Sequence, residues 1–199
     1  MPPDPTNGNT ISPVKSLQDA IRTGMHNADD PSDASRIFIC EHNLQRAWRD
    51  HDLKSIFPPS KYSPEERKTI RDRFLRVLSV LILIGWSSDD LLNKFHFQFL
   101  RAVGREDINL PIDKEKLEFL DTSSFVFWQH QFAFCPAVVL ESEYSHIQRI
   151  EKDKRLPFTG KRVEVGGGAY GSVSQVTIAP RCLRHIDRKT ENIEVAISL

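Results

Sequence analysis

The chain has 199 residues, of which 39% are hydrophobic and 27% are charged, and these fractions suit a soluble globular protein of one domain or one and a half. Lys plus Arg and Asp plus Glu both number 27, so the net charge is zero. A neutral chain argues against a general polyanion binder, and we expect no nucleic-acid partner.

The cysteines and the apolar runs indicate the compartment. Three cysteines that lie far apart argue against a disulfide framework and for a reducing environment. The N-terminal stretch Met-Pro-Pro-Asp-Pro lacks the basic and apolar regions of a signal peptide. The longest apolar run, residues 80–84, is far shorter than the roughly 20 residues that span a bilayer. We therefore expect a cytoplasmic or nuclear protein that is not secreted and has neither a transmembrane segment nor a membrane partner.

Residues 1–33 are predicted to be a mostly disordered tail with one short helix. Residues 1–13 hold four of the twelve prolines together with Asn, Gly, Ser and Thr, which is a disordered composition. From Val14 to His26 the apolar residues recur at helical spacing, which predicts the helix. These apolar positions are Val14, Leu17, Ile21 and Met25.

Residues 34–120 are predicted to form a helical region. Its first helix is capped by Ser35 and extends to about Trp48. The apolar stripe of this helix consists of Ile37, Cys40, Leu44, Ala47 and Trp48.

The next helix has the clearest start signal in the chain. The stretch Ser63-Pro64-Glu65-Glu66 offers a Ser cap, a proline at the first helical position and a glutamate three residues after the cap. We expect this helix to reach about Ile84, with Gly85 beyond its end. Its second half, from Phe74, is apolar nearly all round and is the expected centre of the helical core.

Two further helices complete the region. Ser88-Asp89-Asp90 is placed to cap a helix that stops near Gly104, and Asp113 caps a short helix over residues 114–120. The alternation in residues 95–99 also permits a strand, but the recurrence of apolar residues at i, i+4 and i+8 favours a helix. The residues expected to point inward are Leu91, Leu92, Phe95, Phe99, Leu100 and Val103.

Residues 121–155 are predicted to bridge the helical region and a following set of strands. The aromatic cluster in residues 125–134 is expected to be core or the dock between the two parts. Residues 137–140 indicate a short buried strand, and residues 141–154 are polar.

Residues 165–173, Val-Gly-Gly-Gly-Ala-Tyr-Gly-Ser-Val, fit the pattern G-x-G-x-x-G-x-V. Glycines at this spacing let the backbone turn tightly and approach an anion, with N–H groups directed at phosphate oxygens. Residues 162–165 and 173–178 alternate in polarity on either side, which predicts strand, glycine loop, strand. A dinucleotide-binding loop would need a following helix, and a Walker A loop would need Gly-Lys-Ser/Thr. Neither follows Gly171, so both of these classes of phosphate-binding loop are disfavoured.

A third apolar stretch indicates which family the glycine-rich segment resembles. Residues 193–199, Ile-Glu-Val-Ala-Ile-Ser-Leu, resemble the Val-Ala-Ile-Lys strand of protein kinases, with Ser198 at the lysine position. Residues 156–199 thus resemble the first three strands of a protein-kinase N-lobe, and the chain is similar to fungal kinase-like proteins with an N-terminal helical region. We expect an α+β fold in which this helical region precedes a short antiparallel sheet.

The resemblance implies a set of roles for the loop and its strands. Gly166, Gly168 and Gly171 would let backbone amides cover the phosphates, with Tyr170 at the loop tip. The apolar roof over adenine would consist of Val165, Val173 and Ala196, with Ser198 beside them.

The same resemblance implies weak ATP binding and no catalysis. Ser198 is neutral and too short to hold phosphates as the kinase lysine does, and no residue is identified as a catalytic group or a Mg²⁺ ligand. Two explanations fit the end of the chain inside this strand: a truncated kinase relative, or a gene model that leaves out the remaining kinase sequence. The substitution at the lysine position favours the second.

Two functions therefore stay open at this point. The first is a truncated protein-kinase-like protein that carries the ATP-binding glycine loop without the catalytic machinery. The alternative is a non-enzymatic module whose helical region binds or regulates a protein partner. The sequence leaves the oligomeric state open.

Other motifs have simpler interpretations. The basic run from Arg67 to Arg76 is expected to be a solvated helix face. The seven histidines lack metal-site spacing, and we expect no metal. Cys182 follows Arg181 in a basic loop, and we expect an exposed cysteine there.

Overall fold

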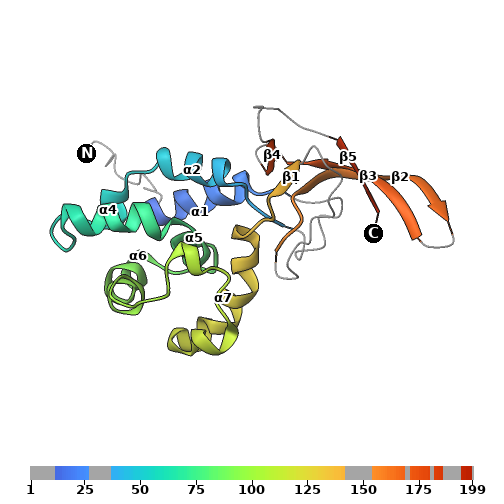
Figure 1. The fold of residues 1–199 in the computed structure, drawn as a ribbon. Coiled ribbons are helices and arrows are strands. Elements are labelled where there is room, and N and C mark those ends of the chain that lie inside the picture. Colours follow the sequence, from blue (N-terminus) through green and yellow to red (C-terminus); the bar gives the residue numbers. More distant parts are fainter. Residues whose placement is uncertain are drawn as a thin grey trace, which may run out of the picture.

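A computed structural model gives the fold, and the residues that it describes are 12–26, 37–141, 154–168, 171–179, 182–185 and 194–198. Figure 1 shows a helical body from which a narrow sheet projects to one side. The α+β expectation is confirmed, because helices fill the N-terminal part and a three-stranded antiparallel sheet follows. None of the described helices has the length and apolarity that crossing a membrane requires.

The helical body is built from short helices. They are α1 (Pro13–Gly24), α2 (Glu41–Arg49), α3 (Leu53–Ile56), α4 (Pro64–Arg73), α5 (Leu75–Leu83), α6 (Ser88–Asp90), the π-helix η2 (Leu91–Leu100), the 3₁₀ helices η3 (Asp107–Asn109), η4 (Lys114–Ser123) and η5 (Phe132–Phe134), and α7 (Ser124–Gln131). Their apolar faces meet in one hydrophobic cluster.

Helix α5 lies at the centre of this cluster, as its apolar sequence predicts. Its residues 77–82 are all buried, including Ser79. The cluster also takes in residues of α1 and of α7, so the helical core extends beyond residues 34–120 at both ends. Each large apolar side chain buried in this way contributes about 1.5–3 kcal/mol.

Buried polar side chains join elements that are distant in sequence. Gln131 pairs with the backbone of Ile112 in both directions, donating to its carbonyl at 2.8 Å and accepting from its N–H at 2.7 Å. The Trp48 indole N–H of α2 donates to the Ser79 hydroxyl of α5 at 2.8 Å. These groups are hydrogen-bonded and thereby avoid the penalty of burying an unpaired polar group.

The capping box at Ser63 is confirmed, but the single long helix predicted after it is wrong. The Ser63 hydroxyl accepts from the Glu66 N–H, and the Glu66 carboxylate accepts from the Ser63 N–H. The helix then breaks at Phe74, whose φ of −133° and ψ of 12° are not helical. Phe74 is buried and packs edge-on against Phe95.

Asp107 caps α5 in place of a local residue. Its Oδ2 and Oδ1 accept from the backbone N–H groups of Arg76 and Val77, each at 2.9 Å. Phe74, at the N-cap position, offers no such acceptor. A carboxylate 30 residues away in sequence therefore allows a second helix to begin directly after the break.

The start predicted for the second helix is also wrong. Helix α2 begins at Glu41, and the side chain of Cys40 at its N-cap makes no capping hydrogen bond to the first turn. Ser35, the expected cap, lies outside the described residues. The preceding residues are extended because their backbone pairs elsewhere: Phe38 bridges to His26, and the Ile39 N–H donates to the Ala133 carbonyl at 2.8 Å.

The helix predicted after Trp86 is confirmed over the strand alternative, with corrections. Its cap is Ser87 in a capping box with Asp90, one residue before the expected start. Val103, expected to point inward, is 96% exposed. Gly85 has a positive φ of 97° directly after the cap of α5, which confirms the helix end predicted there. The following helix ends at Leu100, earlier than the predicted stop near Gly104.

Asp113 does not cap the next helix with its side chain. Its Oδ2 instead accepts from the Lys116 ammonium at 2.6 Å. The segment over residues 114–123 is a 3₁₀ helix with a kink at Asp121, whose φ is positive at 50°.

The strands form two small sheets. The larger contains β2 (Phe158–Gly168), β3 (Gly171–Ile178) and β5 (Glu194–Ser198), all antiparallel and in that spatial order. The smaller pairs β1 (Val139–Glu141) in parallel with β4 (Leu183–His185). A strand was predicted over residues 137–140, which overlaps β1. Strand β4 was not predicted, because it follows Cys182 in a segment expected to be a basic loop.

A second hydrophobic cluster joins the sheets to the helical body. It consists of the buried residues Phe38, Cys40, Ile178, Ala179 and Cys182, with Val139 and Phe158 packed against it. A backbone hydrogen bond from the Ala137 N–H to the Arg155 carbonyl at 2.7 Å reinforces the junction. A second, from the Ala179 N–H to the Pro157 carbonyl at 2.7 Å, joins the adjacent ends of β3 and β2. The expectation that Cys182 is exposed is wrong, because this cluster covers it.

Substitution of Asp107 tests the capping of α5. Asp107→Ala leaves the N–H groups of Arg76 and Val77 without their acceptor, and we expect the free energy of unfolding to fall by about 1–3 kcal/mol. Denaturant unfolding followed by circular dichroism measures this. The control is Asp113→Ala, whose side chain makes no cap hydrogen bond, with a change within about 0.5 kcal/mol. Equal losses in both variants would contradict the assignment.

The same carboxyl predicts a dependence of stability on pH. Burial raises the pKa of Asp107 to about 6, against the lowering effect of the two backbone N–H groups. The protonated form is thus favoured on folding, so the stability it contributes is present at low pH and is lost as pH rises through about 6. We expect wild type to lose stability relative to Asp107→Asn between pH 4 and 7. A constant difference across that range would show that Asp107 does not titrate as described.

Candidate functional site

The glycine-rich sequence forms the connection between β2 and β3. Gly168 lies opposite Gly171, which closes the hairpin around residues 169 and 170. The strand predicted on each side of the glycines is confirmed, but Gly166 and Gly168 belong to β2 and Gly171 begins β3, so the glycines are paired strand residues. Tyr170, predicted at the loop tip, lies outside the described residues.

The register brings three of the predicted site residues onto one face of the sheet. Val173 on β3 lies opposite Ser198 on β5, and two residues further along β3, Gln175 lies opposite Ala196. Alternate residues of a strand belong to the same face, so Val173, Ala196 and Ser198 share one face. Gly166 lies opposite Val173 and joins the row from β2.

Val165 falls outside this row. The register of β2 against β3 shifts between Glu164 and Gly166, which leaves Val165 as the extra residue of a β-bulge. Val163 lies opposite Gln175 and so occupies the face on which the sequence analysis placed Val165. The alternation of residues 162–165 marks both valines as strand residues, but a bulge between them and the glycines has no signal in that alternation.

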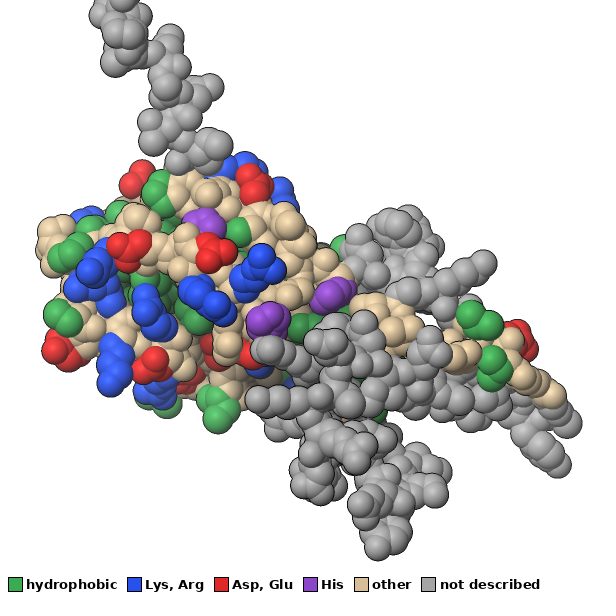
Figure 2. Space-filling model, turned by 90° about the horizontal axis from the view of Figure 1, so that it is seen from above, with side chains coloured by type: hydrophobic (Ala, Val, Ile, Leu, Met, Phe, Trp, Pro, Cys, Tyr) green, Lys and Arg blue, Asp and Glu red, His purple; other side chains and the backbone are tan. Residues whose placement is uncertain are grey.

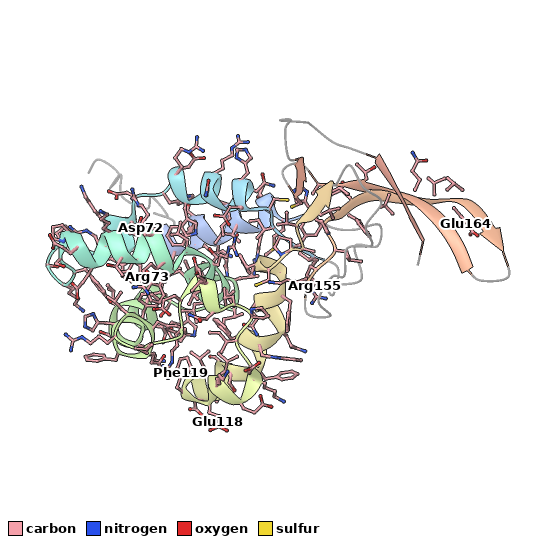
Figure 3. The ribbon with its side chains drawn as sticks, in the orientation of Figure 1. Asp72, Arg73, Glu118, Phe119, Arg155 and Glu164 are labelled. Atoms are coloured by element: carbon pink, nitrogen blue, oxygen red, sulfur yellow. The ribbon has the colours of Figure 1, made fainter. Side chains whose placement is uncertain are left out.

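The hairpin is open to solvent near the glycines. Val163 and Val165 are 51% and 54% exposed, which is unusual for valine in a strand. A Cβ built on Gly166 meets no atom within 4 Å. Figure 3 places Glu164 on the part of the sheet that lies away from the helical body, and Arg155 at the junction with it. Among the described residues, the glycine end of the hairpin is therefore exposed.

The backbone supplies the chemistry of this site. Among the described strands of the larger sheet, β2 lies at the edge, and its outer N–H and C=O groups pair with no other described strand. Glycines without Cβ atoms allow a large anion to approach these N–H groups closely. Val163 and Val165 add exposed apolar surface at the same end.

A separate hollow of about 680 Å³ lies on the helical body beside α2, α3 and α5. Its lining includes the Arg49–Asp52 stretch. The ring of His51 is held on both sides, with Nε2 3.0 Å from the Ser16 hydroxyl and Nδ1 2.8 Å from the Ala47 carbonyl. Both charge signs line this hollow, and His51 is engaged in structural hydrogen bonds.

The basic run after Ser63 includes structural ion pairs as well as a solvated face. Arg73 contacts Glu106 at 2.8 Å, and Arg76 contacts Glu41 at 2.6 Å. Figure 2 shows Lys and Arg side chains interspersed with Asp and Glu on this side of the molecule. Among the residues described, no group of three or more His, Cys, Asp or Glu side chains is arranged to hold a metal ion.

No protein-family model, curated protein or solved structure matches the chain. The candidate site is therefore defined by the glycine pattern and by the geometry of the hairpin.

Substitution of Gly166 tests the openness of the hairpin. Gly166 has space for a Cβ and no positive φ, so Gly166→Ala should stabilise the strand by about 0.4–1 kcal/mol by restricting the unfolded chain. Hydrogen exchange of the β2 and β3 amides measures this locally. As the matched control, Gly85→Ala adds a Cβ at a φ of 97° and should destabilise the helical body by about 1–2 kcal/mol. Faster exchange in Gly166→Ala would contradict an open site.

Proposed function

We propose that residues 158–198 form a partial nucleotide clamp of the protein-kinase type, which binds ATP weakly through the glycine hairpin. The observation that carries the proposal is the register of the three strands. It places Val173, Ala196 and Ser198 on one face beside Gly166, as the resemblance to a kinase N-lobe requires. The proposal locates the protein in the cytoplasm or the nucleus, where ATP and reduced thiols occur together.

Different residues are proposed to contact the phosphates and the adenine ring of ATP. The backbone N–H groups around Gly166, Gly168 and Gly171 are the groups offered to the phosphates. The apolar positions Val173 and Ala196, with Val163 in the same row, are offered to the adenine ring. The bulge at Val165 re-aims the strand where the glycines begin, which is a common role of bulges next to binding sites.

The serine at position 198 is the reason that we propose weak binding of ATP. The residue lies directly opposite Val173, where a kinase carries the lysine that holds the α- and β-phosphates. A serine supplies no charge there. A hydrogen bond to a charged group contributes about 1.5–3 kcal/mol, so its absence reduces affinity by roughly tenfold or more. The proposal therefore concerns nucleotide binding and assigns no phosphoryl transfer to this chain.

Titration of the full chain with ATP and Mg²⁺, followed by calorimetry, tests the clamp. We expect saturable binding in the millimolar range, and Gly166→Glu should abolish it because the new carboxylate repels the phosphates. Gly166→Ala is the matched control for the added Cβ and should keep more affinity than Gly166→Glu. Ser198→Lys should tighten binding by about tenfold or more. Absence of binding at millimolar ATP in both wild type and Ser198→Lys would overturn the proposal.

A second candidate is a non-enzymatic interaction module. Its support is that the helical body has its own hydrophobic core and exposes large apolar side chains: Phe97 is 70% and Ile108 is 89% exposed. A protein partner bound by the full chain and lost in Phe97→Ser with Ile108→Ser would favour this candidate. Nucleotide binding that survives this double substitution would still support the clamp, so the two functions are separable.

A further inference from the structure

Two cysteines that are distant in sequence meet at the junction between the helical body and the sheets. The sulfur atoms of Cys40 and Cys182 are 3.1 Å apart, although 142 residues separate them. Both residues are buried in the second hydrophobic cluster, and both are free thiols. A disulfide requires an S–S distance of about 2.05 Å, so an approach of about 1 Å would join them.

The backbone on each side holds the two cysteines in place. Cys40 is the N-cap residue of α2, and the neighbouring Ile39 N–H donates to the Ala133 carbonyl at 2.8 Å. The Cys182 N–H donates to the Ala179 carbonyl at 3.1 Å, and its carbonyl accepts from the Val139 N–H at 2.9 Å. The pair thus lies between two hydrogen-bonded segments, one in each part of the molecule.

The contact also prepares one thiol for reaction. The hydrogen bond from the Cys40 thiol stabilises the Cys182 thiolate and lowers the pKa of Cys182, and it raises the pKa of Cys40. The thiolate is the form of cysteine that reacts with oxidants. Burial slows access of the oxidant, but the resolving thiol is already in contact, so the second step is intramolecular.

We infer that Cys40 and Cys182 form a reversible disulfide that links the sheets to the helical body when hydrogen peroxide is present. The Cys182 thiolate attacks the peroxide, whose O–O bond breaks to give a sulfenic acid and, after protonation, one water. The Cys40 sulfur then attacks the sulfenic sulfur and expels hydroxide, which takes up the Cys40 proton as a second water. Two thiols are oxidised and one peroxide is reduced, and a dithiol reductant reverses the step.

The third cysteine provides an internal comparison. Cys135 is equally buried, but it lies in the core of the helical body, and burial raises the pKa of its thiol to about 11. A raised pKa and an apolar site make a thiol inert. The inference therefore singles out one pair and leaves the third cysteine unreacted.

Thiol counting on the full chain tests the inference. We expect hydrogen peroxide to lower the count in the subsequently denatured protein from three thiols to one, with peptide mapping that identifies a Cys40–Cys182 cross-link. Dithiothreitol should restore all three. Cys135→Ser should still lose two thiols, whereas Cys40→Ala and Cys182→Ala should each form no intramolecular disulfide. Circular dichroism of each variant checks its fold, and using both single variants covers the case in which one of them misfolds.

A second measurement tests whether the disulfide restrains the sheet. Hydrogen exchange of the β3 amides should slow by about tenfold or more in the oxidised wild type and stay unchanged in peroxide-treated Cys182→Ala. Three remaining thiols after peroxide treatment would overturn the inference. So would a cross-link through Cys135, oxidation of Cys182 to a sulfinic acid without a cross-link, or a disulfide that leaves β3 exchange unchanged.

Discussion

The fold depends on how the buried helix α5 begins. The preceding helix ends at Phe74, whose ring enters the core and whose backbone leaves the helical region of φ and ψ. Asp107 then supplies the acceptors that the first N–H groups of α5 need. Because these groups are not left unpaired, the chain can change direction between two helices and place the most apolar segment at the centre of the body.

The sheets depend in turn on the helical body. Strands β2 and β3 are joined to it through one small cluster that includes Phe38, Ile178 and Phe158. The opposite end of the hairpin is exposed, and it carries the glycines and the valines of the candidate site (Figures 1 and 3). The same sheet is therefore anchored at one end and exposed at the other.

The two proposals concern opposite ends of this sheet. The nucleotide clamp uses backbone N–H groups at the glycine end and apolar positions on one face, whereas the cysteine pair lies at the anchored end. A tie at the anchored end would restrict motion of β3, the strand that carries Val173. The clamp does not require the disulfide, and the disulfide does not require the clamp.

Sequence alone determined the features whose signals are local. The capping box at Ser63, the helix end before Gly85 and the strand on each side of the glycines all follow from residues that are close together in the sequence. The candidate glycines and the positions of Val173, Ala196 and Ser198 were found in the same way.

Tertiary structure decided what depends on distant partners. The break at Phe74 is allowed by a cap 30 residues away, and the Cys40–Cys182 contact spans 142 residues. The bulge that moves Val165 out of the row and brings Val163 into it arises from pairing between strands. Short-range patterns specify which backbone conformation a segment prefers, but register, remote capping and burial are set by the partner that each segment meets.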